Sequence, residues 1–214
     1  TIHIETHAPK NVVHYIGVDI ALAVGTGDFT VMAVVAVDEE NNFWLVDLYR
    51  QQTDPDTSAN QFVQLCKQYK PRYCWIEDDN ASKVWHRLVM LKAKALVSPL
   101  LLSKMRGRDK QERAAPLRSL FIQQRVRILN RPWTQLALAE LAEFPGGRHD
   151  DIVDAFGVVA KEMHKISPAK RLQVEERPPI IGNIQEKEGK LWTTQTLDQL
   201  ITLNAGRKRG FGRI

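Results

Sequence analysis

The sequence predicts an α/β protein built on one mixed sheet, in which three antiparallel strands are followed by parallel strands and helices cover both faces. Three apolar segments rich in β-branched residues, at residues 14–20, 29–37 and 43–50, are joined by short loops, which is typical of an antiparallel meander. From residue 54 onward, segments with helical periodicity alternate with short apolar segments, which favours parallel strands connected by helices.

Helices and strands alternate after the meander. Asp54 and Pro55 are typical of a helix start, and Pro71 ends that helix. Further along we expect strands at residues 72–77, 97–102 and 126–129, and helices at residues 81–96, 111–124, 132–143 and 149–165. The polar residues 1–13 are expected to form an irregular leader to the sheet.

Two of these helices carry apolar residues at helical spacing. The helix at residues 81–96 has Val84, Leu88 and Leu91 on one face. The last helix has a stripe that should pack on the sheet, formed by Ile152, Phe156, Val159 and Met163.

The chain is expected to divide into a domain of residues 1–165 and a basic, loosely ordered tail of residues 166–214. The tail lacks periodicity, and only residues 192–203 are compatible with a short helix. The net charge is +5, and the residues from Lys165 onward account for it with ten basic and five acidic side chains. Because the sequence starts without Met or a secretory signal layout, we expect it to be part of a longer polypeptide.

Composition narrows the classes of function. The chain has no run of 18 apolar residues, so we expect no membrane span. The two cysteines, Cys66 and Cys74, match neither a zinc-ligand pair nor a redox motif, which favours reduced thiols. The six histidines show no spacing typical of a transition-metal site.

Acidic residues end two of the predicted strands. Asp19 lies near the C-terminal end of the first strand, and Glu77 ends the strand at residues 72–77. An aspartate in a buried strand is costly unless it is paired or coordinates an ion. Because neighbouring strands lie about 4.8 Å apart, acids at the ends of neighbouring strands can converge.

A third acidic group opens the last predicted helix. Asp150, Asp151 and Asp154 follow His149 within five residues, and like charges one turn apart repel one another. A divalent cation would remove this repulsion. Asp150 suits the helix cap, which makes Asp151 the preferred ligand.

Carboxylate oxygens suit Mg²⁺ or Mn²⁺ rather than zinc or copper. We expect two such ions about 4 Å apart, which would clamp a phosphodiester, activate a water for in-line attack and stabilise the leaving 3′ oxygen. The predicted catalytic ligands are Asp19, Glu77 and Asp151. Further candidates, as ligands or orienting groups, are Asp150, Asp154 and Asp78, with His149 as a proton carrier or plain hydrogen-bond partner.

Two basic segments are candidates for contact with the phosphates of double-stranded DNA, with a solvated surface as the alternative for each. The first surrounds the start of the helix at residues 111–124 and contains Lys104, Arg106, Arg108, Lys110 and Arg113. The second lies near the end of the chain and contains Arg207, Lys208 and Arg209.

The acidic segments together resemble a known family. Gly17-Val18-Asp19, the run from Trp75 to Asn80 and the run from His149 to Ala155 are similar to the nuclease domain of phage terminase large subunits. That family belongs to the RNase H-like (retroviral integrase-like) superfamily, and the resemblance covers residues 15–163.

This resemblance implies an RNase H-like fold and a metal-dependent endonuclease that cuts concatemeric viral DNA during packaging. It also implies a packaging ATPase domain in the full-length protein, a small terminase subunit and a portal as partners, and the cytoplasm of an infected bacterial host as the location. The chain has no GxxxxGK[ST] phosphate loop, so the motor part is expected to lie outside this sequence.

Three other functions stay open on the sequence. A Holliday-junction resolvase or a transposase would use the same acids on a different substrate. Gly25-Thr26-Gly27 after the Asp19 strand faintly resembles the first phosphate loop of actin-like ATPases. In a non-catalytic DNA-binding or assembly module, the acids would be structural and DNA binding would be indifferent to a chelator.

Overall fold

The computed structural model describes residues 2–21, 28–93, 98–104 and 109–170, and the backbone of residues 184–187 and 190–193. Contacts within the chain form two units, Thr1–Arg171 and Leu172–Ile214. The residues just after 165 pack on the first unit. The Tyr15 hydroxyl bonds to the backbone of Ser167, and the Asn11 side chain donates to the carbonyl of Lys170.

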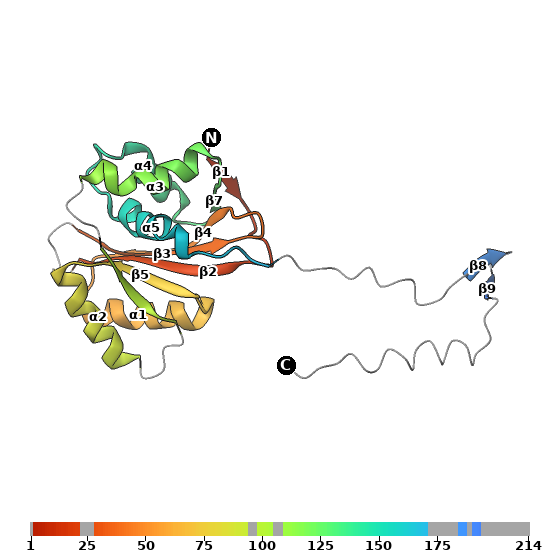
Figure 1. Cartoon of the computed structure of the whole chain (residues 1–214), viewed down its shortest axis with the longest axis horizontal. Coiled ribbons are helices and arrows are strands. Elements are labelled where there is room, and N and C mark those ends of the chain that lie inside the picture. The colour runs from red at the N-terminus through yellow and green to blue at the C-terminus, as the bar shows by residue number, and fades with distance from the viewer. Residues whose placement is uncertain are drawn as a thin grey trace. The chain divides into compact units, whose positions relative to one another are not determined.

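A seven-stranded mixed sheet forms the first unit, with the strand order β1-β7-β4-β3-β2-β5-β6 (Figure 1). Its strands are β1 (His3–Glu5), β2 (Val13–Asp19), β3 (Thr30–Val37), β4 (Phe43–Gln51), β5 (Tyr73–Glu77), β6 (Leu100–Ser103) and β7 (Val126–Leu129). Strands β2, β3 and β4 form an antiparallel meander, whereas β5 and β7 pair in parallel with β2 and β4. The predicted α/β mixed sheet is confirmed.

The meander forms where the sequence is continuously apolar, because its strands are covered on both faces. Every residue of β3 is buried. The predicted irregular leader is wrong in one part: β1 pairs in parallel with β7 and extends the sheet by one strand. A three-residue strand gives too short a pattern to be found from periodicity.

Five helices of the first unit cover the two faces of the sheet. They are α1 (Pro55–Tyr69), α2 (Asn80–Lys92), α3 (Lys110–Ile122), α4 (Thr134–Glu143) and α5 (Asp151–Lys161), and a single 3-10 turn, η1 (Met163–Lys165), follows α5. Helices α1 and α2 lie on one face, and α3, α4 and α5 lie on the other (Figure 1). No helix in the described ranges is long and apolar enough to cross a membrane.

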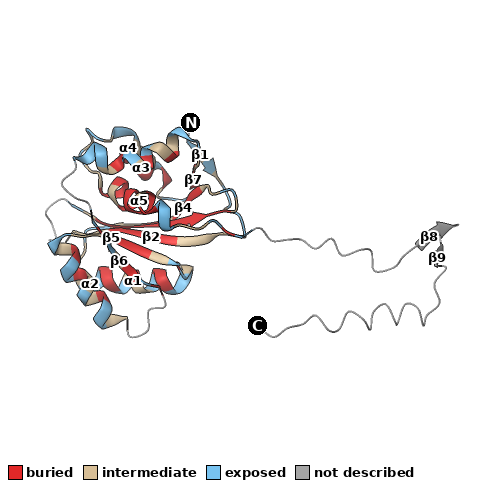
Figure 2. Ribbon diagram, in the orientation of Figure 1, coloured by how far each residue is buried: buried red, intermediate tan, exposed pale blue. Residues whose placement is uncertain are grey.

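Each face has its own apolar core, formed by buried residues of the sheet and of the helices that cover it, and Figure 2 colours the buried residues red. On the α2 side, Trp85 and Val89 are fully buried, whereas Val84 and Leu91 are exposed. The apolar face expected from Val84, Leu88 and Leu91 is therefore not the buried one. Cys66 and Cys74 are free, buried thiols in the same core.

Helix α5 crosses the sheet directly over β2, and Gly17 makes this close approach possible. A Cβ atom at residue 17 would lie 1.9 Å from the carbonyl oxygen of Ala155 and 2.7 Å from Cγ2 of Val159. Side chains alternate along a strand, so residue 17 and Asp19 face the same side of the sheet. The contact at Gly17 therefore also sets how near α5 lies to Asp19.

The described part of the second unit is an antiparallel hairpin of β8 (Ile184–Lys187) and β9 (Lys190–Thr193). Residues 192 and 193 thus lie in a strand, where the sequence was compatible with a helix start. The remainder of that expected helix, residues 194–203, lies outside the described residues.

We expect Gly17→Ala to lower the free energy of unfolding by about 3 kcal/mol, because the backbone of α5 must move to admit the methyl group. Urea unfolding measures the change. Gly157→Ala in α5 is the matched control, since no atom lies within 4 Å of its added Cβ. The control should be neutral or stabilise by up to about 1 kcal/mol. Equal stability of Gly17→Ala and the native domain would contradict the close packing of α5 on β2.

The turn between β3 and β4 gives a second prediction, because Asp38 organises it. Its Oδ1 accepts hydrogen bonds from the backbone N–H groups of Glu40 and Asn42, and its Oδ2 accepts from the side chains of Asn42 and Trp44. Burial by itself raises the pKa of Asp38, but these hydrogen bonds outweigh burial and the pKa is lowered. A lowered folded pKa contributes stability above the unfolded pKa, which is lost as the pH falls through the folded pKa.

We therefore expect Asp38→Ala to lower the free energy of unfolding at pH 7 by about 1–3 kcal/mol. The difference from the native domain should shrink as the pH falls below about 4, the unfolded pKa of Asp. Chemical unfolding at pH 7 and at pH 3 measures both effects. Glu40→Ala, at an exposed position of the same turn, is the control and should change little. A constant difference at both pH values would mean that the Asp38 charge does not matter.

Candidate active site

Two strands and one helix bring acidic side chains to one edge of the sheet. Asp19 ends β2 and Glu77 ends β5, and the two strands are parallel neighbours with Val18 opposite Ile76. Asp154 lies in the first turn of α5. The acids at the ends of β2 and β5 therefore lie near an acid of α5.

Between these elements lies a small cavity lined by Val18, Asp19, Glu77, Asp154 and Val158. Its volume is about 10 Å³, which is space for one water-sized species. Three of the five lining residues are acids, one from each of β2, β5 and α5. Carboxylates from three separate elements therefore meet at this cavity.

Burial and like charge raise the pKa values of two acids of the cavity, Asp19 and Asp154. Burial raises the pKa of Asp19 well above its usual range, and the carboxylates of Asp154, Asp151, Glu77 and Asp150 raise it further, in that order. Burial also raises the pKa of Asp154 to about 6, although the neighbouring Arg113 guanidinium opposes this. Desolvation and like charge both disfavour the ionised form, so the site favours a cation that can neutralise it.

Asp151 lies in the same turn of α5 but does not line the small cavity. Its Oδ2 atom is 3.8 Å from an Arg50 guanidinium nitrogen and 3.7 Å from Nδ1 of His149. Its side chain is only 11% exposed. The prediction that Asp151 is a primary metal ligand stays a prediction, and among the acids of α5 the cavity contains Asp154.

The start of α5 is capped from another helix. Asp150 occupies the N-cap position, as expected, but its side chain makes no capping hydrogen bond. Instead, Oε1 of Glu140 in α4 accepts a 2.5 Å hydrogen bond from the N–H of Ile152. A carboxylate at a helix N-terminus satisfies free amides and interacts well with the helix dipole. Asp150 is left to pair with Lys110, at 2.6 Å.

Arg50, near the end of β4, contacts both the capping residue Glu140 and Asp151 in the first turn of α5. Its guanidinium lies 3.6 Å from Glu140 and 3.8 Å from Asp151 and stacks over the Phe29 ring, 3.5 Å from the centroid. His149 packs edge-on against the same ring. Neither Arg50 nor Glu140 was expected from the sequence to take part in the site. Nothing in the spacing of a strand arginine and a helix glutamate 90 residues apart signals that they meet.

The predicted DNA-binding residues fall into three groups. Arg113 and Lys110 in α3 contact the acids: Arg113 lies 3.2 Å from Glu77 and 3.3 Å from Asp154. Lys104 is exposed, and its carbonyl accepts a hydrogen bond from Lys161. The others lie outside the described residues, namely Arg106, Arg108, Arg207, Lys208 and Arg209.

The secondary candidates Asp78 and His149 lie beside the cavity rather than in its lining. Asp78 pairs with Lys83 of α2 at 2.8 Å, and this hydrogen bond is the main cause of its lowered pKa. His149 reaches Asp151 at 3.7 Å. Within the described ranges, no group of three or more His, Cys, Asp or Glu side chains is already arranged to hold a metal ion. Arg113 instead lies between two of the acids.

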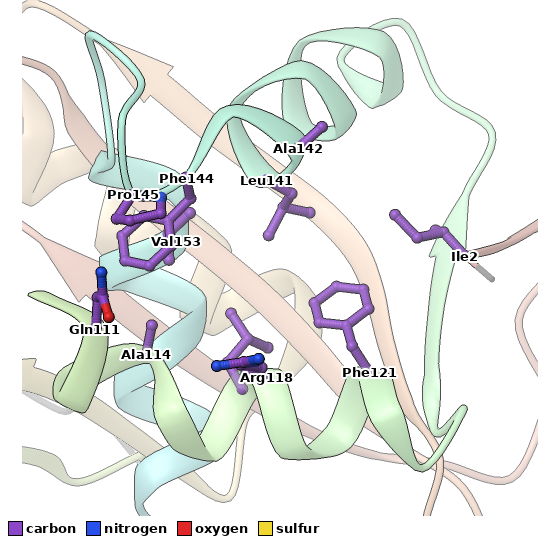
Figure 3. A pocket seen from close by; sticks show the side chains of 11 residues that line it. Ile2, Gln111, Ala114, Arg118, Phe121, Leu141, Ala142, Phe144, Pro145 and Val153 are labelled. Carbon is purple, nitrogen blue, oxygen red and sulfur yellow. The ribbon is translucent and has the colours of Figure 1, made fainter.

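A larger cavity of about 530 Å³ lies on the other side of α5, between α3, α4 and the α4–α5 loop (Figure 3). Its lining is largely apolar and includes Phe121, Leu141, Phe144 and Val153, with Arg118 at its margin. None of the acids described above lines it, so the larger cavity does not contain the candidate site.

Comparison with known proteins identifies the family. The model of the terminase RNaseH-like domain matches residues 16–160. No curated protein sequence matches the chain. The nuclease domain of the large terminase subunit of bacterial virus Sf6 is similar in structure, with a TM-score of 0.52 and 11% identity over 72% of this chain and 89% of that one.

Two further solved structures are similar. One is a mutant of the Sf6 domain solved with manganese and beta-thujaplicinol, with a TM-score of 0.52 and 10% identity over 72% of this chain and 89% of that one. The other is the fowlpox virus Holliday junction resolvase, with a TM-score of 0.47 and 17% identity over 72% of this chain and 99% of that one.

At such low identity, the likeness to the Sf6 domain shows the RNase H-like fold, and the family match carries the assignment. The matched region, residues 16–160, covers more than half of the chain and contains the acids of β2, β5 and α5. The chain therefore belongs to the family of terminase RNase H-like nuclease domains.

Proposed function

We propose that this domain is a metal-dependent endonuclease that cuts concatemeric double-stranded DNA while a viral genome is packaged. The observation that carries the proposal is the meeting of Asp19, Glu77 and Asp154, from β2, β5 and α5, around one small cavity. Membership of the terminase family supports the choice of substrate.

The donor set of the cavity fits Mg²⁺ or Mn²⁺. All three acids offer carboxylate oxygens, which these hard cations prefer. Burial first and the neighbouring carboxylates second raise the pKa of Asp19, and a divalent cation would relieve both penalties on its ionised form. Asp19, Glu77 and Asp154, which line the cavity, would hold the ions, and Asp151 and Asp150 would orient these ligands.

Two bound ions would supply the activated water for in-line attack and the charge that stabilises the leaving 3′ oxygen. The residues of this chain position the site. Asp19 ends a central strand and is held by its ladder pairing with β3. Glu140 and Arg50 fix the first turn of α5, and thereby the direction of Asp151. His149 lies 3.7 Å from Asp151 and would help to orient that carboxylate.

The cations around the cavity suit a polyanionic substrate. Lys104 is exposed next to Ser103, at the end of the strand that pairs with Glu77. A lysine there can contact a phosphate without reading sequence. As further parts of the proposal, the domain works with a packaging ATPase, a small terminase subunit and a portal in an infected bacterial cell.

Replacing the cavity acids should abolish cutting. We expect Asp19→Asn, Glu77→Gln and Asp154→Asn each to slow plasmid nicking in Mn²⁺ by more than about a hundredfold. Removing a group that only orients ligands costs about 10–100-fold, and this range is expected for Asp151→Asn. Gel assays of supercoiled plasmid measure the rates.

Asp56→Asn, on α1 and paired with Lys92, is the control acid and should cut at the native rate. Thermal unfolding should show that every variant is folded. If Asp151→Asn is as inactive as Asp19→Asn while Asp154→Asn cuts well, Asp151 rather than Asp154 is the primary ligand. If Asp151→Asn and Asp154→Asn both cut at the native rate, α5 does not contribute to catalysis.

Two kinds of assay, removal of divalent ions and a change of DNA substrate, distinguish the proposed nuclease from a resolvase and from a non-catalytic DNA-binding module. Excess EDTA should stop cutting, and Mg²⁺ or Mn²⁺ should restore it. Linear and plasmid duplexes should be cut at comparable rates. Strong preference for four-way junctions would indicate a resolvase. DNA binding that is indifferent to chelator, without nicking in Mn²⁺, would indicate a non-catalytic module.

A further inference from the structure

Arg113 is the residue of α3 most closely joined to the acids. One terminal nitrogen lies 3.2 Å and 3.4 Å from the two carboxylate oxygens of Glu77, and the other lies 3.3 Å from Oδ2 of Asp154. These acids come from β5 and α5, so one planar guanidinium bridges two separate elements. The Arg113 side chain is only 19% exposed, which screens the interaction from water less than at an open surface.

The contacts of Arg113 involve the same oxygens that a divalent ion would need. Glu77 and Asp154 both line the small cavity, and both are bonded to Arg113. A carboxylate oxygen cannot serve a guanidinium and a divalent ion equally well, because two cations at one ligand repel each other. Arg113 and the ion therefore compete for Glu77 and Asp154.

The turn that carries Arg113 lies at the start of α3, before a proline inside the helix. Lys110, one turn earlier on α3, makes a similar ion pair with Asp150, at 2.6 Å. Pro116 lies inside α3, three residues after Arg113. Because proline has no backbone N–H, the helical ladder lacks the bond that Pro116 would donate toward this first turn. The first turn is held by its N-cap, Asp109, and by the ion pairs that Lys110 and Arg113 make with the acids.

We propose that Arg113 is a displaceable counterion, which neutralises Glu77 and Asp154 in the metal-free site and turns to a DNA phosphate when divalent ions bind. This inference rests on the proposed function. It adds that the binding of divalent ions and the binding of DNA are coupled. Metal binding frees a guanidinium beside the cavity, and a phosphate accepts a guanidinium bidentately. Metal should therefore strengthen DNA binding, and DNA should strengthen metal binding by the same factor.

The first test measures metal binding without DNA. Arg113→Gln should bind Mn²⁺ about tenfold more tightly than the native domain in isothermal titration calorimetry, since the competing charge-assisted bonds are gone. Without metal it should unfold at a lower temperature, and Mn²⁺ should raise its unfolding temperature more. Arg113→Lys keeps the charge but cannot bridge two carboxylates with one planar group, so its affinity should lie between the two.

Arg118→Gln is the matched control, because Arg118 lies on the same helix and lines the larger apolar cavity instead. It should bind Mn²⁺ like the native domain. Unchanged or weaker Mn²⁺ binding by folded Arg113→Gln would overturn the competition. If Arg113→Gln does not fold, an intermediate affinity for Arg113→Lys supports the proposal and a native affinity overturns it.

The second test measures DNA binding with Ca²⁺, with the ion absent as the reference. Ca²⁺ should increase the affinity of the native domain for duplex DNA by severalfold, and Arg113→Gln should lose most of this increase. An equal increase in both proteins would overturn the transfer of Arg113 to phosphate. Failure of the native domain to bind Mn²⁺ or to cut DNA would instead overturn the proposed function, and the coupling with it.

Discussion

Mutual repulsion among carboxylates at one edge of the sheet is the constraint on which the rest of this structure depends. Strand ends and a helix start bring several acids together, and four of them lie beside a cation. Glu77 and Asp154 are paired with Arg113, Asp150 with Lys110 and Asp151 with Arg50. These cations lie on α3 and β4, whereas the acids they contact lie on β5 and at the start of α5. The ion pairs therefore connect elements that are far apart in the chain.

Close packing keeps the acids in place against this repulsion. Gly17 lets α5 lie against β2 without an intervening side chain. Glu140 of α4 bonds the N–H of Ile152 at the start of α5. The helix is thus fixed at its start and along its length, and its acids cannot relieve their repulsion by moving apart. Such packing would limit the movement of the acids in the proposed metal-dependent cleavage.

The proposed exchange of Arg113 for a divalent ion follows from the same balance. A site that is stable without metal needs internal cations, and a site that works with metal must be able to release them. Arg113 meets both needs because it makes its contacts from the first turn of α3, on the near side of Pro116. The larger cavity is lined by Val153 and Ala114, which are the sequence neighbours of Asp154 and Arg113. The two regions therefore both include residues of α5 and α3.

Local sequence was sufficient for the α/β sheet, for Asp19 and Glu77 at strand ends and for the acid-rich start of α5, because periodicity, turn residues and helix caps act over a few neighbouring positions. It also predicted Arg113 and Lys110 as contacts for DNA, which stays a prediction, but it gave no sign of their ion pairs with Glu77, Asp154 and Asp150. It missed β1, which is three residues long, and the capping of α5 by Glu140, which lies in another helix. Only the tertiary structure decided that Asp154 lines the cavity with Asp19 and Glu77 while Asp151 contacts Arg50. The reason is that the rotation of α5 on the sheet depends on contacts between residues far apart in the chain, and no local pattern encodes it.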